Sequence, residues 1–123
     1  MKTVLIVDDC KEIRQLVLTT LDLGEFTVLE ASSGSEAIIL AEKYIPDLII
    51  MDIVMPGLID GIEATRHIKA QSETAGCQVI ILTGSQLDRT SESLAAGAVD
   101  VLTKPFSPLD LIGKVEQILG IQV

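Results

Sequence analysis

The apolar run from Leu48 to Met51 contains no polar residue, and the carboxylate of Asp52 ends it abruptly. An unbroken apolar run of this length is typical of a central β-strand that other elements cover on both faces. A carboxylate at the end of such a strand is costly to bury unless the strand opens onto an edge where a ligand binds. The alternative interpretation is that Asp52 only caps the turn that follows.

Three further apolar segments of the chain end in the same way. The polar residues that follow the four segments are Asp8 and Asp9, Asp52, Thr83, and Lys104. Carboxylates, a hydroxyl and an ammonium group are the groups expected around a bound cation and a phosphate. Taken singly, Thr83 could be an ordinary strand-end residue and Lys104 a surface lysine.

Strand and helix patterns alternate along the whole chain. Strands are expected at 3–7, 26–30, 47–52, 78–83 and 99–103, and helices at 13–21, 34–44, 61–70 or 71, 87–96 and 108–119. This alternation predicts an α/β domain with an open parallel sheet and helices on both faces. In such sheets the ligand site lies beyond the carboxyl ends of the strands. Topology alone therefore predicts that the polar strand-end residues gather in one place.

Several helix boundaries carry explicit sequence signals. Ser33 and Asp60 are each followed three residues later by Glu, which is the spacing of a capping box. Ser107 precedes a proline that suits the first position of a helix, and Gly24 is expected to end the first helix. The helix at 87–96 has the weakest pattern, because serine and threonine lower its propensity. We expect it to be the most mobile helix.

Composition restricts the function further. The 123 residues are expected to form one domain, residues 1–123, with a formal net charge of -9 that disfavours direct binding to nucleic acid. The apolar runs are too short to span a membrane, and Met1 leads straight into a strand, so we expect a cytoplasmic protein without a signal peptide. Cys10 and Cys77 lack metal-ligand spacing and are interpreted as reduced thiols.

The gathered residues predict a particular chemistry. Two unit charges about 4 Å apart repel by roughly 4 kcal/mol at an effective dielectric constant near 20, so three carboxylates need compensation. Lys104 supplies one charge, and Mg²⁺, with Mn²⁺ as the alternative, fits a cluster without His or Cys better than zinc. Asp52 is the best-placed nucleophile for a phosphoryl group, with Asp8 and Asp9 as metal ligands. Lys104 and Thr83 would bind phosphoryl oxygens.

Several short motifs of the sequence resemble those of a known family. The residues that carry the resemblance are Val7-Asp8-Asp9, Met51-Asp52 with Met55-Pro56-Gly57, Thr83-Gly84, and Lys104-Pro105-Phe106. Together they resemble the signature of the receiver domain of two-component response regulators, of the single-domain chemotaxis or phosphorelay type. The resemblance covers essentially the whole chain. It implies a flavodoxin-like (βα)5 three-layer sandwich with a five-stranded parallel sheet of order 2-1-3-4-5.

The resemblance also implies roles for individual residues. Asp52 would accept a phosphoryl group from a phosphohistidine on a sensor histidine kinase or a histidine phosphotransfer protein. Asp9, Asp52 and the Val54 main-chain carbonyl would bind Mg²⁺ directly, and Asp8 would bind it largely through water. Thr83 would be the switch hydroxyl, Lys104 the phosphate-binding cation, and the Lys104–Pro105 peptide would be cis.

A phosphorylation switch of this type would act on a protein partner. The readout surface would comprise the helix at 87–96, the strand at 99–103 and the last helix, and would control a downstream effector protein. Contact during phosphoryl transfer would use the first helix. The protein would not be an enzyme beyond its own phosphorylation and slow autodephosphorylation, and would be a monomer or a phosphorylation-dependent dimer.

Two features depart from the family pattern. Position 101 usually carries Tyr or Phe, and here it is Val101, so we predict intact phosphorylation with an altered surface readout. The loop at 55–61 is one residue longer than usual, which could expose Leu58 or Ile59 beside the site.

Three other readings stay open from sequence. The chain could be a receiver fragment of a larger transcriptional regulator with an output domain. It could be a metal-dependent phosphohydrolase with an aspartyl-phosphate intermediate, although Asp8-Asp9-Cys10 lacks the Asp-x-Asp pattern of haloacid-dehalogenase-like enzymes. It could carry a flavin or nucleotide, although no Gly/Ser/Thr-rich phosphate loop follows the first strand. Sustained turnover of a phosphate ester would indicate the enzyme, and a single phosphoryl adduct would indicate the switch.

Overall fold

The computed structural model describes residues 2–22, 26–84 and 89–121. Its elements alternate between strand and helix, as the sequence predicts. The strands are β1 (Lys2–Val7), β2 (Phe26–Ala31), β3 (Leu48–Asp52), β4 (Gln78–Gly84) and β5 (Asp100–Lys104). The helices are α1 (Lys11–Leu21), α2 (Gly34–Tyr44), α3 (Gly61–Ala70), α4 (Thr90–Ala96) and α5 (Pro108–Leu119). Within the described residues no helix has the length and apolar character needed to cross a membrane.

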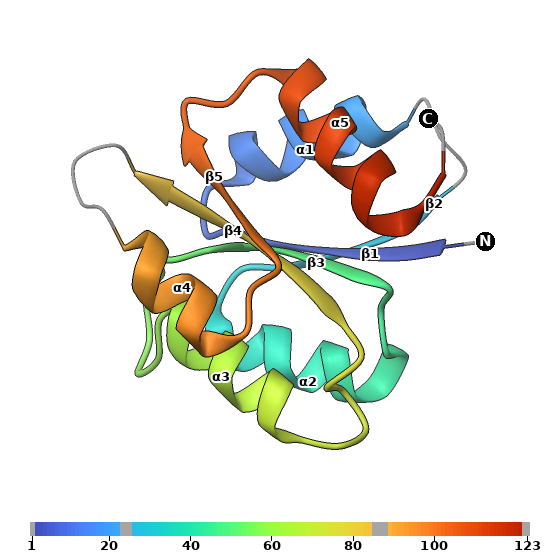
Figure 1. Cartoon of the computed structure of the whole chain (residues 1–123). Helices are drawn as coiled ribbons and strands as arrows, with labels where there is room; N and C mark the ends of the chain where they lie inside the picture. Colours follow the sequence, from blue (N-terminus) through green and yellow to red (C-terminus); the bar gives the residue numbers. More distant parts are fainter. Residues whose placement is uncertain (1, 23–25, 85–88, 122–123) are drawn as a thin grey trace.

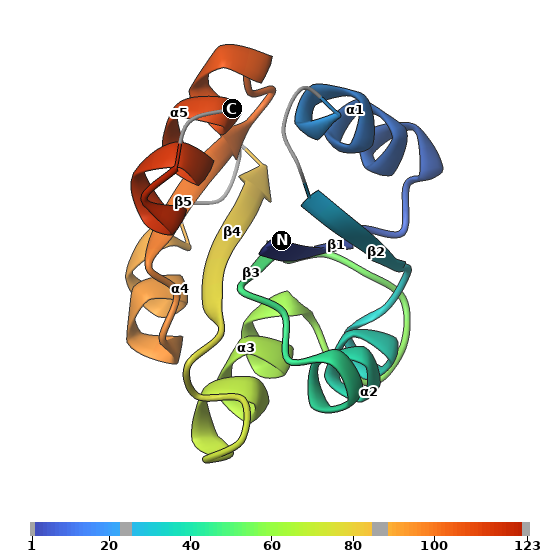
Figure 2. The same ribbon diagram turned by 90° about the vertical axis from the view of Figure 1, so that its right-hand side faces the viewer.

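The five strands form one parallel sheet of order β2-β1-β3-β4-β5, which confirms the predicted α/β topology. Helices α1 and α5 cover one face, and α2, α3 and α4 cover the other, so the molecule has three layers (Figures 1 and 2). Every residue of β3 is buried, as expected of a central strand with helices on both sides.

Alternate residues of the strands contribute to two separate apolar cores. Leu5, Ile49 and Ile81 of the strands form one core with Ile62 and Ile68 of α3, on the side of α2, α3 and α4. The other core lies under α1 and α5. Its buried members are Val4, Ile6, Val17, Leu21, Leu48, Ile50, Ile80, Leu82, Leu102, Leu111 and Val115. The two cores fix the strands firmly, so the positions of the strand ends are well determined.

The predicted helix starts are confirmed at three places. The Ser33 hydroxyl accepts a hydrogen bond from the Glu36 amide at 3.2 Å, and Asp60 accepts one from the Glu63 amide at 2.8 Å. Ser107 caps α5 in the same way, with proline at the first position. Helix α4 begins at Thr90. The predicted start of this helix near position 87, and the predicted stop at Gly24, lie outside the described residues.

The two apolar residues that the longer loop between β3 and α3 was expected to expose differ in their surroundings. Leu58 is fully exposed. Ile59 packs against the core beneath α2, and a methyl group placed on Gly34 would lie 3.0 Å from its Cγ1 atom. The extra residue therefore leaves Leu58 in solvent while Ile59 anchors the loop.

Candidate functional site

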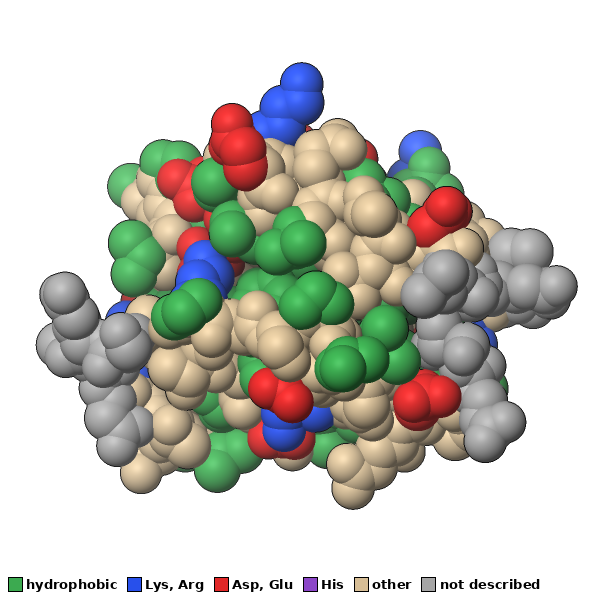
Figure 3. All heavy atoms as spheres, turned by 90° about the horizontal axis from the view of Figure 1, so that it is seen from above, with side chains coloured by type: hydrophobic (Ala, Val, Ile, Leu, Met, Phe, Trp, Pro, Cys, Tyr) green, Lys and Arg blue, Asp and Glu red, His purple; other side chains and the backbone are tan. Residues whose placement is uncertain are grey.

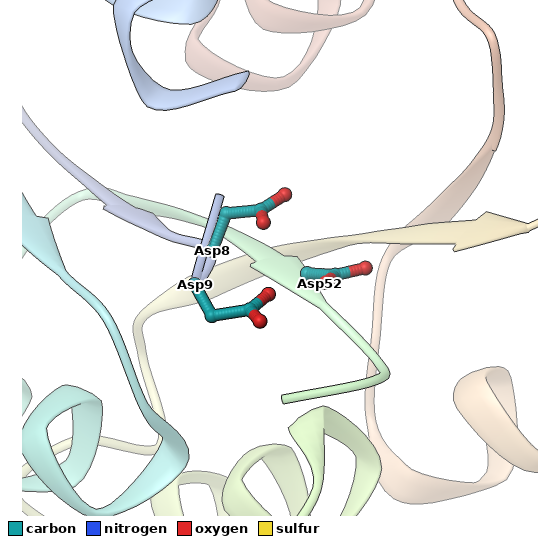
Figure 4. Close-up of side chains that lie close together, drawn as sticks. All are labelled: Asp8, Asp9 and Asp52. Atoms are coloured by element: carbon teal, nitrogen blue, oxygen red, sulfur yellow. The ribbon is translucent and has the colours of Figure 1, made fainter. Parts of the chain in front are cut away.

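The carboxylates of Asp8, Asp9 and Asp52 meet at the carboxyl edge of the sheet, as predicted. Asp8 and Asp9 directly follow β1, and Asp52 ends β3, its neighbour in the sheet. Ligand oxygens of all three lie within 4.8 Å of one another, and their side chains point into the same space (Figure 4). Asp8 and Asp52 are only 1% and 6% exposed, whereas Asp9 is exposed.

Lys104 brings a positive charge from the end of β5 into this cluster. Its amine donates hydrogen bonds to Asp8 Oδ2 at 3.1 Å and to Asp52 Oδ1 at 3.0 Å. The peptide bond between Lys104 and Pro105 is cis, as the family resemblance implies. The interpretation of Lys104 as a surface lysine is therefore wrong.

The protonation behaviour of the site reflects burial and crowding. Burial raises the pKa of Asp52 above its ordinary value, and the nearby carboxylates of Asp8 and Asp9 raise it further, while Lys104 partly opposes the shift. Burial disfavours the charged amine of Lys104, but its contacts with Asp52 and Asp8 outweigh this and raise its pKa. At neutral pH the amine is therefore firmly charged.

Thr83 and Val54 lie beside the cluster on the wall of a pocket of about 500 Å³. Thr83 is buried at the end of β4, next to Lys104 on the neighbouring strand. The rest of the wall is mostly apolar and comes from α1, from the segments that follow β3 and β5, from the end of β4 and from the residue before α4. Its residues are Ile13, Leu16, Ile53, Gly84, Arg89, Pro105 and Phe106. Figure 3 looks onto the side of α1 and α5, where hydrophobic side chains gather across the surface.

Three of the five predicted side chains, those of Asp52, Thr83 and Lys104, belong to strands, and Asp8 and Asp9 directly follow β1. The metal-ligand role of the Val54 carbonyl and the switch role of the Thr83 hydroxyl stay predictions. The donor set fits the predicted ion type, because all three carboxylates offer oxygen ligands, and the Asp9 carboxylate is exposed to solvent. The cluster could therefore bind a hard divalent cation.

The sequence pattern did not reveal the part played by Gly61, the first residue of α3. The Gly61 amide donates to the Ile53 carbonyl at 2.8 Å. A side chain at position 61 would overlap the backbone oxygen of Asp52. Only glycine lets the first turn of α3 approach the end of β3 this closely. The Asp60-Gly61 pair after the loop is the sequence signal that could have indicated it.

Comparisons with known proteins agree with this geometry. The family model described as "Response regulator receiver domain" matches residues 4–116. The chemotaxis protein CheY of Halobacterium salinarum is 39% identical over 120 residues, covering 96% of this chain and 97% of that protein. The phosphate regulon transcriptional regulatory protein PhoB of Pseudomonas aeruginosa is 36% identical over 119 residues, covering 96% of this chain but only 52% of that protein.

Solved structures show the same likeness. The chemotaxis response regulator CheY4 of Vibrio cholerae superimposes with a TM-score of 0.87 at 33% identity, covering 96% of this chain and 98% of that one. The receiver domain of the Francisella response regulator 1452 gives a TM-score of 0.87 at 33% identity, covering 98% of each chain.

Fold, site and comparisons define a receiver module of two-component signal transduction. The chain belongs to the response regulator receiver domain family. It spans about half the length of the PhoB relatives that it matches.

Proposed function

We propose that this chain is a phosphoacceptor switch in which Asp52 receives a phosphoryl group from a phosphohistidine. The observation that carries the proposal is the meeting of Asp8, Asp9 and Asp52 with the Lys104 amine at one edge of the sheet. Asp52 and Lys104 end strands of the sheet, and Asp8 and Asp9 directly follow another strand.

The transfer would form one bond and break another. An Asp52 carboxylate oxygen attacks phosphorus, the P–N bond of the phosphohistidine breaks, and its electron pair stays on the imidazole nitrogen. Mg²⁺, or Mn²⁺ in its place, would neutralise the negative charges of the attacking carboxylate and of the phosphoryl group. Asp8 and Asp9 would hold this cation, while the charged Lys104 amine and the Thr83 hydroxyl would bind the remaining phosphoryl oxygens.

The phosphoryl group would then change the surface next to Thr83. A dianionic group recruits the hydroxyl and the amine. Among the described residues no atom lies within 4 Å of a methyl group placed on Gly84, which leaves space for the accompanying movement. The expected readout surface is the face of α4, β5 and α5. Val101 lies half-buried against the core and replaces the usual ring, so we expect movement of the described residues 89–96 without a swinging aromatic side chain.

The implied partners are a sensor histidine kinase or a histidine phosphotransfer protein, and a downstream effector protein. The protein would act in the cytoplasm as a monomer or a phosphorylation-dependent dimer, without enzymatic turnover of external substrates. The near-complete coverage of the Halobacterium salinarum CheY favours a free-standing switch. The partial coverage of PhoB favours the second candidate, a receiver that is one domain of a transcriptional regulator.

Incubation with Mg²⁺ and acetyl phosphate, followed by intact mass measurement, tests the phosphoacceptor function. We expect one added phosphoryl group on the wild type and none on Asp52→Asn. Asp47→Asn is the matched control, because it changes an aspartate at the other end of β3, and it should be phosphorylated normally. Phosphorylation of Asp52→Asn, or none of the wild type, would contradict the proposal. Sustained turnover of a phosphate ester would indicate the phosphohydrolase instead.

A further inference from the structure

Arg14 lies beneath the acidic loop and contacts its backbone. The side chain projects from α1 and is only 17% exposed. Its Nη1 atom donates to the backbone carbonyl of Asp8 at 2.7 Å. Its Nε atom pairs with Glu30 Oε1 of β2 at 3.0 Å. The guanidinium therefore links a helix, the acidic loop and a strand.

Asp8 is held through both its backbone and its side chain. Its amide donates to the Ala31 carbonyl at 3.1 Å, and its carbonyl accepts from Arg14. Its Oδ1 atom accepts from the Cys10 amide at 2.9 Å, and Oδ2 accepts from Lys104. Lys104 thus acts on the carboxylate, whereas Arg14 acts on the peptide unit that joins Asp8 to Asp9.

We infer that Arg14 is a positioning residue for the metal-binding acids. The peptide unit that it holds fixes the direction in which the chain enters Asp9, whose exposed carboxylate completes the cluster around Asp52. A guanidinium suits this task, because its planar fork directs hydrogen bonds along fixed and different lines. Glu30 holds the fork in place. The inference rests on the proposed function, since it concerns the affinity of that site for its cation.

A positioning role and a purely electrostatic role of Arg14 predict opposite changes in Mg²⁺ affinity when the side chain is replaced. A positive charge near the site repels a cation, so loss of charge alone would tighten Mg²⁺ binding. Loss of the backbone contact would weaken it, because the acids would need to be ordered during binding. Arg14→Lys keeps the charge but not the fork, and Arg14→Met removes both.

The test measures Mg²⁺ affinity by isothermal titration calorimetry. We expect about tenfold weaker binding for both Arg14→Lys and Arg14→Met, as is usual when a group behind a metal ligand is lost. Glu30→Gln should weaken binding less, because the bond to the Asp8 carbonyl remains. Unchanged affinity of Arg14→Lys, or tighter binding by Arg14→Met, would overturn the inference.

Two control variants separate positioning from stability and from net charge. Val17→Ala removes buried volume from the same helix without touching the loop, so it should lower the melting temperature and leave Mg²⁺ affinity unchanged. Arg66→Met removes a charge from an exposed ion pair with Glu63 and should also leave the affinity unchanged. Equal weakening in Val17→Ala would assign the effect of Arg14 to stability and overturn the inference.

Amide hydrogen exchange gives a second readout that needs no metal. The Cys10 amide donates to Asp8 Oδ1, so a loosened loop should exchange this hydrogen faster in Arg14→Met than in Val17→Ala. Equal exchange would also overturn the inference. Failure of the wild type to bind Mg²⁺ or accept a phosphoryl group, with accelerated exchange in Arg14→Met, would refute the proposed function and limit Arg14 to ordering the loop.

Discussion

Strand β3 has an aspartate at each end, and the two side chains differ in their hydrogen bonds and in the charges around them. Asp47 directly precedes the strand, and its carboxylate accepts a hydrogen bond from the Thr3 amide at 2.8 Å. Its own amide donates to the Thr3 carbonyl at 2.9 Å, and its carbonyl accepts from Gln78. Asp47 therefore joins β3 to its two neighbours in the sheet, and its charge strengthens a bond that the fold needs.

Asp52 shares its end of the strand with two other carboxylates, and the Lys104 amine pairs with Asp8 and Asp52. Burial and like charges raise its pKa, so the folded state holds this charge at a cost. The same residue type thus stabilises the sheet at one end and strains it at the other. If the proposed ligand binds at the carboxyl edge, its site is held at the expense of stability.

The largest expected effect concerns how rigidly the backbone of Asp52 is held. Gly61→Ala should lower the free energy of unfolding by about 3 kcal/mol, because the new methyl group overlaps the Asp52 carbonyl and α3 must shift. Urea denaturation measures the loss. Gly113→Ala in α5 is the control: its added methyl group has open space, and we expect a gain of about 0.5–1 kcal/mol. A Gly61→Ala variant as stable as the wild type would mean that the Asp52 end of β3 is no more constrained than the Asp47 end.

A smaller effect is expected from removing the charge that compensates the acids. Lys104→Met should lower the free energy of unfolding by about 2 kcal/mol at pH 7, because the buried oxygens of Asp8 and Asp52 lose their shared donor. The raised pKa of Lys104 means that its contribution is complete at neutral pH and is lost only as pH rises through that alkaline value. Thermal unfolding at pH 7 and at a pH above the ordinary lysine pKa of about 10.4 would measure this.

Lys114→Met provides the matched control for this prediction. Lys114 pairs with Asp100 at 2.6 Å, but Asp100 is 39% exposed. An exposed pair contributes about 0–1 kcal/mol, so this variant should lose much less stability than Lys104→Met. Added Mg²⁺ should reduce the difference in stability between Lys104→Met and the wild type. It should leave the difference between Lys114→Met and the wild type unchanged. Equal losses would show that the acidic edge is not under unusual electrostatic stress.

These contrasts also show what the sequence could reveal. The cluster of acids and the approach of Lys104 were predictable, because parallel strands place their carboxyl ends along one edge. The sheet order followed only from the family resemblance. Asp52 was recognisable because an acid interrupts the apolar pattern at the end of a buried strand.

The contacts behind the site were not predictable in the same way. Gly61 and Arg14 act on backbone carbonyls of residues brought near by loops, and no periodic pattern records such contacts. The exposure of Leu58 followed from the extra loop residue, but the packing of Ile59 on Gly34 depends on the path of the loop in space.

The smallest expected effects come from replacing the aspartate at each end of β3. The two replacements should change the free energy of unfolding in opposite directions. Asp47→Asn weakens a charge-assisted hydrogen bond and should lower the free energy of unfolding by about 1 kcal/mol. Asp52→Asn removes a buried charge from a crowded cluster and should raise it by about 1 kcal/mol. Both can be measured by urea denaturation at pH 7 without divalent ions.

The pH dependence of Asp52→Asn supplies the control. Because the pKa of Asp52 is raised on folding, proton binding to it favours the folded wild type at low pH, and this contribution is lost as pH rises through the folded pKa. The advantage of Asp52→Asn should therefore be small in acid and grow towards neutrality. Saturating Mg²⁺ should stabilise the wild type by mass action and reverse the order of the two proteins at pH 7. An Asp52→Asn variant that is less stable than the wild type without metal, or an advantage that grows as pH falls, would show that Asp52 supports the fold as Asp47 does.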